Sequence, residues 1–209
     1  MRLIHVSDNH GLLYHLPGGA AVVVHSGDFL PNRTFGHRII EETYQPAWLE
    51  SNKEYLKRWI GDRKFLITHG NHDFCDVTPH LRSYGIDAES LDDRRYVLDG
   101  VVFYGFPYVP YFTGAWNHEA PPKELEIRTE TIDLEGVDVL VAHAPIFGVL
   151  DRNSDGTRCG SKPMRDRLQT SSHAPEYYLC GHIHESNGYQ KWSDIHVYNS
   201  ATIVQTIEI

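Results

Sequence analysis

The sequence predicts an α/β fold of the mixed α+β kind, with two mixed β-sheets packed face to face and helices on their outer sides. Strand-like apolar runs alternate with helix-like segments in the first half, and the second half carries hairpin signals. Short polar motifs directly follow several of the apolar runs. The 209 residues suit a single domain over 1–209, with room for a sizeable core.

The elements of the first half follow from apolar periodicity and from residues that start and end helices. Residues 20–25 are almost all apolar, as in a strand that is buried on both faces. Large apolar residues recur at helical spacing in 46–61, whereas 31–45 is polar and is expected to be a loop. Thr78 and Pro79 suit the start of a short helix and Gly85 suits its end. The predicted elements are strands at 2–7, 20–25 and 64–68 and helices at 46–61 and 78–85.

The second half begins with a predicted hairpin. Asp99 and Gly100 form a turn signal between apolar runs at 96–98 and 101–104. Aromatic residues, Gly and Pro dominate 105–122, and 145–163 is irregular, so both segments are expected to be long loops. The remaining predicted elements are strands at 137–142 and 177–180, a helix around 164–169, and strands at 195–198 and 203–207 that would complete the second sheet.

Charge, hydropathy and cysteine content indicate which partners and which cellular location to expect. The net charge of −9 argues against a nucleic-acid backbone as the main partner, because proteins that bind one usually carry a basic patch. No apolar stretch approaches the length that spans a bilayer, and no secretory signal precedes the first strand, so no membrane association is expected. The three cysteines (Cys75, Cys159 and Cys180) are an odd number without framework spacing, which favours reduced thiols and a cytoplasmic location.

Five short polar motifs are the most informative feature of the sequence. Taken singly, most have an ordinary explanation, since Asp8 and Asp28 follow strands as turn residues do and His143 alone suits a structural histidine. The alternating His182 and His184 direct two imidazoles to the same side of an extended segment, which makes their motif the strongest. The motifs are Asp8-Asn9-His10, Gly27-Asp28, Gly70-Asn71-His72-Asp73, His143 and Gly181-His182-Ile183-His184.

Together the motifs indicate a metal site at the C-terminal edge of the strands. Each follows an apolar run, so strand ends that meet at one edge of a sheet would bring all of these side chains together. Unrelated structural residues would not be expected to recur in this way at successive strand ends. The set offers oxygen and nitrogen ligands and no thiolate, which suits divalent first-row transition metals better than a structural zinc ion.

The ordered motifs resemble the D-x-H, GD, GNH, H and GHxH pattern of the calcineurin-like metallophosphoesterases, and every position of that pattern is filled. The resemblance covers essentially the whole chain and implies a four-layer α-β-β-α sandwich. It also implies two divalent metal ions, with Mn²⁺ favoured and Fe, Ni²⁺ or Zn²⁺ compatible. By the family pattern Asp28 would bridge the ions, the first held also by Asp8, His10 and His184 and the second by Asn71, His143 and His182.

The resemblance further implies hydrolysis of a small phosphorylated substrate. A metal-bridging hydroxide would attack phosphorus, and His72 would act as the general acid that protonates the leaving alkoxide. Asp28 and Asn71 would be catalytic through the ions that they hold. The alternative for His72 is a hydrogen-bonding role beside the ions.

The second motif departs from the GDxxDRG pattern of the protein Ser/Thr phosphatases in this superfamily. Pro31 and Asn32 stand where that pattern has an Asp that orients the catalytic histidine and an Arg that clamps a phosphate oxygen. His72 is therefore expected to lack its usual partner, and a phosphodiester, for example a cyclic nucleotide, is favoured over a phosphomonoester. Arg33, one residue late, and Arg158 are the candidate replacements for the missing Arg.

Other segments of the sequence, less specific than the metal motifs, are similar to segments of the small metallophosphoesterase-domain-containing proteins and of related single-domain phosphodiesterases. Among them are Gly105-Phe106-Pro107, His143-Ala144-Pro145 and Tyr198-Asn199-Ser200-Ala201. Two other functions stay open, namely a phosphomonoesterase or nuclease of the same superfamily and a metal-binding scaffold without activity. The aromatic residues of the 105–122 loop could stack a nucleobase or could simply pack the loop; these are Tyr108, Tyr111, Phe112 and Trp116.

Overall fold

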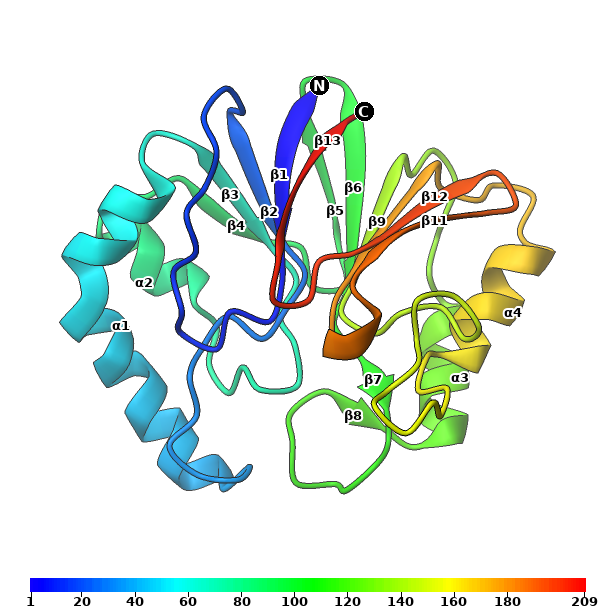
Figure 1. Cartoon of the computed structure of the whole chain (residues 1–209), viewed down its shortest axis with the longest axis horizontal. Helices are drawn as coiled ribbons and strands as arrows, with labels where there is room; N and C mark the ends of the chain where they lie inside the picture. The colour runs from blue at the N-terminus through cyan, green and yellow to red at the C-terminus, as the bar shows by residue number, and fades with distance from the viewer.

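The computed structural model describes all of residues 1–209 and has the predicted four layers, with two β-sheets packed against each other between outer helices (Figure 1). In the first sheet β1 to β4 run parallel, and the last strand of the chain pairs antiparallel with β1. Its strands lie in the order β13 (Val204–Glu208), β1 (Arg2–Val6), β2 (Val22–His25), β3 (Lys64–Ile67) and β4 (Ala88–Ser90).

The second sheet has six strands and contains the predicted hairpin, whose Asp99-Gly100 turn joins its two outermost strands on one side. The strands lie in the order β11 (Gly188–Trp192), β12 (Ile195–Asn199), β10 (Tyr177–Cys180), β9 (Val139–Ala142), β6 (Val101–Phe106) and β5 (Arg95–Leu98). β6, β9, β10 and β12 are parallel, so their C-terminal ends meet at one edge. A separate short ladder joins β7 (Val109–Pro110) and β8 (Glu119–Ala120).

Helices α1 (Arg38–Ile60) and α2 (Thr78–Ser83) cover the outer face of the first sheet, and α3 (Pro122–Glu130) and α4 (Lys162–Thr170) cover that of the second (Figure 1). β2 is buried on both faces, as predicted: Val23 packs under the helices, whereas Val22 and Val24 pack between the sheets. No helix combines the length and apolar character needed to cross a membrane.

Helix α1 begins eight residues before the predicted start, so the prediction of a loop over 31–45 is wrong in its second part. Pro46 lies inside the helix, where it removes one backbone hydrogen bond, rather than at its beginning. The inner face of the first turns carries buried Glu41 and Gln45. Glu41 accepts hydrogen bonds from the backbone N–H groups of Arg33 and Thr34. Because these buried positions are polar, this part of the helix has no apolar periodicity from which it could be predicted.

The last strand was expected in the second sheet, and this expectation is wrong. β13 pairs with β1 in the first sheet, with Val204 opposite Val6. The chain changes sheets after β12, where Ala201 forms a bridge with Ser7. Several other elements were not predicted: β4 has only three residues, β11 has mostly exposed side chains, and α3 buries only Leu125 and Thr129.

Candidate metal centre

The five polar motifs all lie just beyond the C-terminal ends of parallel strands, at the edge where the two sheets meet. β1, β2 and β3 of the first sheet lead into the Asp8, Asp28 and Asn71 motifs. β9 and β10 of the second sheet lead into His143 and the His182 motif. Every metal-ligand candidate of the sequence is therefore delivered to one region, below the strands in Figure 1.

One group of side chains spans both sheets and consists of Asp8, His10 and His184, whose ligand atoms lie close enough together to hold one cation. His184 Nε2 is 3.1 Å from Asp8 Oδ1 and 3.5 Å from His10 Nε2. These are the three residues that the family pattern assigns, with the bridging Asp28, to the first ion.

A second group contains Asp28, His143 and His182. His143 Nε2 lies 3.2 Å from Asp28 Oδ2 and 3.0 Å from Asn71 Oδ1, so the amide oxygen of Asn71 faces the same space. Asp28 also forms a group with His10 and His72. Its carboxylate thus adjoins both the second group and His10 of the first group, which is the position that a bridging ligand needs.

The electrostatics of the centre suit divalent cations. Asp8 and Asp28 are almost completely buried, and the only basic side chains that pair with them are histidines. Burial alone would raise the pKa of Asp28, but His143 and His72 hold it well below its ordinary value. Burial and the nearby His143 lower the pKa of His182 to about 4. An ionised carboxylate and a neutral imidazole are the forms that bind metal, and buried carboxylates need cationic partners.

The buried carboxylates raise the pKa of two neighbouring imidazoles. Burial lowers the pKa of His143, but the Asp28 carboxylate outweighs burial and raises it to about 9. The hydrogen bond from His184 to Asp8 likewise raises the pKa of His184. Metal binding would therefore displace protons from these imidazoles. The donor set fits divalent metal ions.

The backbone is strained where it presents the candidate ligands. Asp8, His10, Asp28 and His182 have φ of 56°, 45°, 57° and 68°, in the left-handed region that residues with a side chain rarely occupy. Such strain gathers at functional sites, where surrounding contacts enforce it.

The motif glycines permit the close packing of these strand ends. A Cβ at Gly70 would collide with the Asp28 carboxylate, and a Cβ at Gly181 would collide with Ser7 and Asp8. Gly70 and Gly181 are therefore required for the approach of neighbouring loops to the candidate ligands.

His72 lacks the usual Asp partner, since Pro31 is in that position, but Asn32 takes the place of that partner. Its Nδ1 donates to Asn32 Oδ1 at 2.5 Å, while Asn32 Nδ2 donates to the His72 carbonyl oxygen at 3.1 Å. Gln45 Nε2 donates to the same carbonyl oxygen. The other ring nitrogen, Nε2, faces the centre, 4.0 Å from Asp28 Oδ2.

The predicted aromatic loop also supports His72. The Trp116 ring lies 3.9 Å from the His72 ring between centroids, and Trp116 is only 7% exposed. Asn117 donates to the carbonyl oxygens of Asn71 and Asp73. The carboxylate of Glu119 holds the loop by accepting backbone hydrogen bonds from 112–114 and from Trp116. Trp116 therefore packs the loop against the motif, whereas Tyr111 and Phe112 stay about half-exposed.

Asp73 is a structural residue of the centre to which sequence reasoning assigned no role. It is buried, and it accepts hydrogen bonds from the backbone N–H groups of Asp28, Leu30 and Gly70, each at 2.9 Å. Its position at the end of the polar motif that follows β3 was the only available signal.

Replacing Asp73 with Ala should lower the free energy of unfolding by about 3–5 kcal/mol, because three buried N–H groups lose their acceptor. Urea unfolding followed by circular dichroism measures this change. Asp73→Asn keeps one acceptor oxygen and should lose less. Unchanged stability of the Ala variant would contradict the bracing role.

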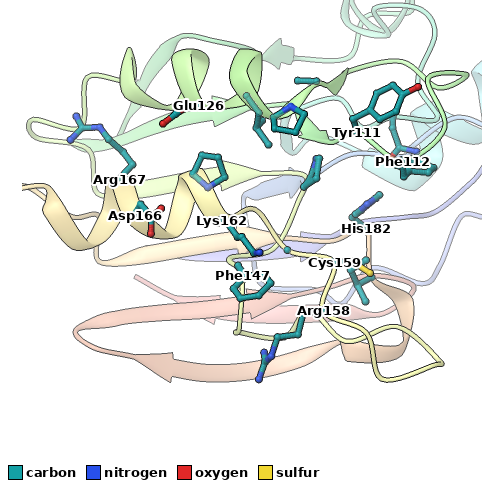
Figure 2. A pocket seen from close by; sticks show the side chains of 18 of the residues that line it. Tyr111, Phe112, Glu126, Phe147, Arg158, Cys159, Lys162, Asp166, Arg167 and His182 are labelled. Carbon is teal, nitrogen blue, oxygen red and sulfur yellow. The ribbon is translucent and has the colours of Figure 1, made fainter.

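A long cleft opens from the centre. Its volume is about 1460 Å³, and it extends from Asp28, His72 and His182 to a furrow between α3 and α4 (Figure 2). Neither candidate replacement for the missing Arg is free beside the centre. Arg33 does not line the cleft, and Arg158 does so with its guanidinium paired to buried Asp151 at 2.8 Å.

Known proteins are similar to this chain in sequence. Human metallophosphoesterase domain-containing protein 1 is 24% identical over 218 residues, which cover 90% of this chain and 61% of the human protein. A UPF0046 protein of Caenorhabditis elegans is 27% identical over 207 residues, covering 90% and 65%. The chain thus spans less than two thirds of the length of these curated relatives.

A solved crystal structure shares the fold with a TM-score of 0.64, covering 96% of this chain and 90% of the other at 15% identity. A family model described as calcineurin-like phosphoesterase matches residues 1–186, which include all five motifs. The chain therefore belongs to the calcineurin-like phosphoesterase family, a family of metal-dependent phosphoesterases.

Proposed function

We propose that this protein is a phosphodiesterase that uses two divalent metal ions, with Mn²⁺ the favoured metal. The observation that carries the proposal is the position of the Asp28 carboxylate, which adjoins both the His143 and His182 imidazoles and those of His10 and His72. When bound, such ions neutralise phosphate oxygens and lower the pKa of a water nucleophile. The presence of every candidate ligand argues against a scaffold that has lost its metals.

His72 is the proposed general acid. The Asn32 oxygen accepts the Nδ1 proton, so when the ring is doubly protonated the second proton is on Nε2, faces the centre and can be transferred to the leaving alkoxide. The Trp116 ring packs against the imidazole and Gln45 holds the backbone of His72, so the imidazole keeps one orientation. The side chain is a quarter exposed, which leaves it accessible to a leaving alkoxide.

The proposed preference for diesters rests on the cations beside the centre. A phosphomonoester carries nearly two charges and three terminal oxygens, so its tight binding rewards an additional cation near the metals. A diester carries one charge and two free oxygens, which two ions can hold alone. Since Arg33 lies outside the cleft and Arg158 is paired with Asp151, no free arginine adjoins the metals.

The kcat/KM for an aryl phosphodiester should therefore exceed that for the matching aryl monoester by about tenfold, the factor expected from one missing charge-assisted contact. The measurement compares bis(4-nitrophenyl) phosphate with 4-nitrophenyl phosphate at one pH and one Mn²⁺ concentration. Faster hydrolysis of the monoester would overturn the diester assignment and favour a phosphomonoesterase.

The proposed substrate is a small phosphorylated molecule, for example a cyclic nucleotide, and not a nucleic acid. The half-exposed rings of Tyr111 and Phe112 line the cleft, and the Phe112 ring centroid is 6.0 Å from that of His182. An aromatic surface at this distance suits stacking of a base.

All three cysteines are free, which supports a reducing, cytoplasmic setting.

A further inference from the structure

The cleft is larger than the metal centre requires. Pockets for small ligands usually have volumes of about 300–1,000 Å³, whereas this cleft has about 1460 Å³. It is lined by residues from Lys162 to Thr170 along α4, and eight helical rises correspond to roughly 12 Å. A substrate bound only at the metals would leave this furrow empty.

Two lysines lie at the N-terminal ends of the helices that form the furrow. Lys123 lies in the first turn of α3 and Lys162 in the first turn of α4, and both line the cleft. Neither ammonium group forms an ion pair, whereas Lys53 and Lys64 do. Lys162 Nζ instead lies 4.8 Å from the centroid of the Phe147 ring (Figure 2). The two ammonium groups are thus available to an anion in the cleft.

The acidic residues of the furrow come later along both helices. Glu126 and Glu130 follow Lys123 on α3, and Asp166 follows Lys162 by one turn on α4. Figure 2 shows Glu126 and Asp166 beside Arg167, at the end of the furrow away from His182. Along each helix of the furrow a lysine therefore comes first and the acidic residues follow, with Arg167 among them, while Glu185 lines the cleft beside His184.

We propose that the furrow between α3 and α4 binds a second phosphate group of the substrate through Lys162 and Lys123. The preferred substrates are then phosphodiesters that carry a further phosphate on the same molecule, and they extend beyond the size of a cyclic mononucleotide. This inference rests on the proposed phosphodiesterase function. Because both lysines are exposed, each contributes the modest energy of a partly screened ion pair.

The test uses two substrates that release the same leaving group. Thymidine 5′-(4-nitrophenyl phosphate) is a diester without a second phosphate, and its 3′-phosphorylated form adds one. With the Mn²⁺-loaded full chain, the 3′-phosphate should lower KM by about fivefold at low ionic strength, the size of an exposed ion pair, and leave kcat unchanged. Added salt should reduce this preference.

Variants assign the effect to the furrow. The quantity compared is the KM of the diester without a second phosphate divided by the KM of the 3′-phosphorylated diester. In Lys162→Ala this ratio should approach one, and in Lys123→Ala it should fall part of the way. Asp166→Asn, on the same helix, should increase this ratio, and Lys191→Ala, on β11 and outside the lining of the cleft, should leave it unchanged. Equal KM values in the unmodified protein, or a ratio that survives Lys162→Ala, would overturn the inference alone. Failure to hydrolyse either diester would instead overturn the proposed function.

Discussion

Removing bound metal ions, or replacing Asp28 with Ala, should abolish phosphoester hydrolysis. We expect a loss of more than about 10³-fold, because the metals supply both charge neutralisation and the activated water. Asp28 is buried, and its carboxylate is shared by groups that include His143, His182, His10 and His72. Its loss should therefore weaken both metal sites together rather than one of them.

The measurement has two parts. Dialysis against a chelator should remove metal and activity in parallel, as judged by elemental analysis, and added Mn²⁺ should restore both. Asp28→Ala should contain less metal than the unmodified protein and should not recover with Mn²⁺. Asp194→Ala, which removes an exposed carboxylate from the turn between β11 and β12, is the control. Full activity in verified metal-free protein would contradict the two-metal mechanism.

A folding defect can be separated from a metal defect in the same experiment. The Asp28 carboxylate accepts a hydrogen bond from the His72 backbone N–H at 2.7 Å, so Asp28→Ala also removes a structural contact. Asp28→Asn retains one acceptor oxygen at this position. We expect the Asn variant to melt close to the unmodified protein and still to lose metal, because an amide lacks the second anionic oxygen needed to bridge two ions.

The strands that carry the candidate ligands could be predicted because local sequence determines them. β2, β3, β9 and β10 are short apolar runs buried in their sheets, and a polar motif follows each of them. Parallel strands then bring these motifs to one edge without further information. The location of the centre therefore follows from pattern alone, whereas the occupancy and roles of the candidate ligands stay predictions.

The residues that orient His72 could not be found in this way. Asn32 is 40 positions before His72, and its role depends on the fold bringing the two together. Trp116 lies in a loop whose shape is held by Glu119, and its contact with His72, far away in the sequence, depends on the fold that brings this loop to the motif. The first turns of α1 were missed for a similar reason. Gln45 is buried because it donates a hydrogen bond to the His72 carbonyl oxygen, and not because it packs in an apolar core.

Replacing His72 with Ala should reduce kcat by about 10²–10³-fold for a diester with an alkyl leaving group, within the usual range for a general acid. Both metals should remain bound, because the groups around Asp8 and His143 keep their own ligands. With 4-nitrophenolate, which leaves without a proton, the loss should be much smaller. The comparison of kcat for the two leaving groups, with metal content measured in the same samples, therefore reports on proton transfer.

Asn32→Ala provides the matched variant, because it removes the hydrogen bond at Nδ1 and leaves Nε2 in place. If Asn32 orients the acid, this variant should show the same dependence on the leaving group with a smaller loss, of about tenfold, the usual cost of one hydrogen bond to a charged group such as the imidazolium. A general acid acts only where the leaving group needs a proton, whereas a merely structural histidine would impair both substrates. Equal losses for alkyl and nitrophenyl esters in His72→Ala would therefore assign His72 to the support of the centre and leave the proton donor to another group.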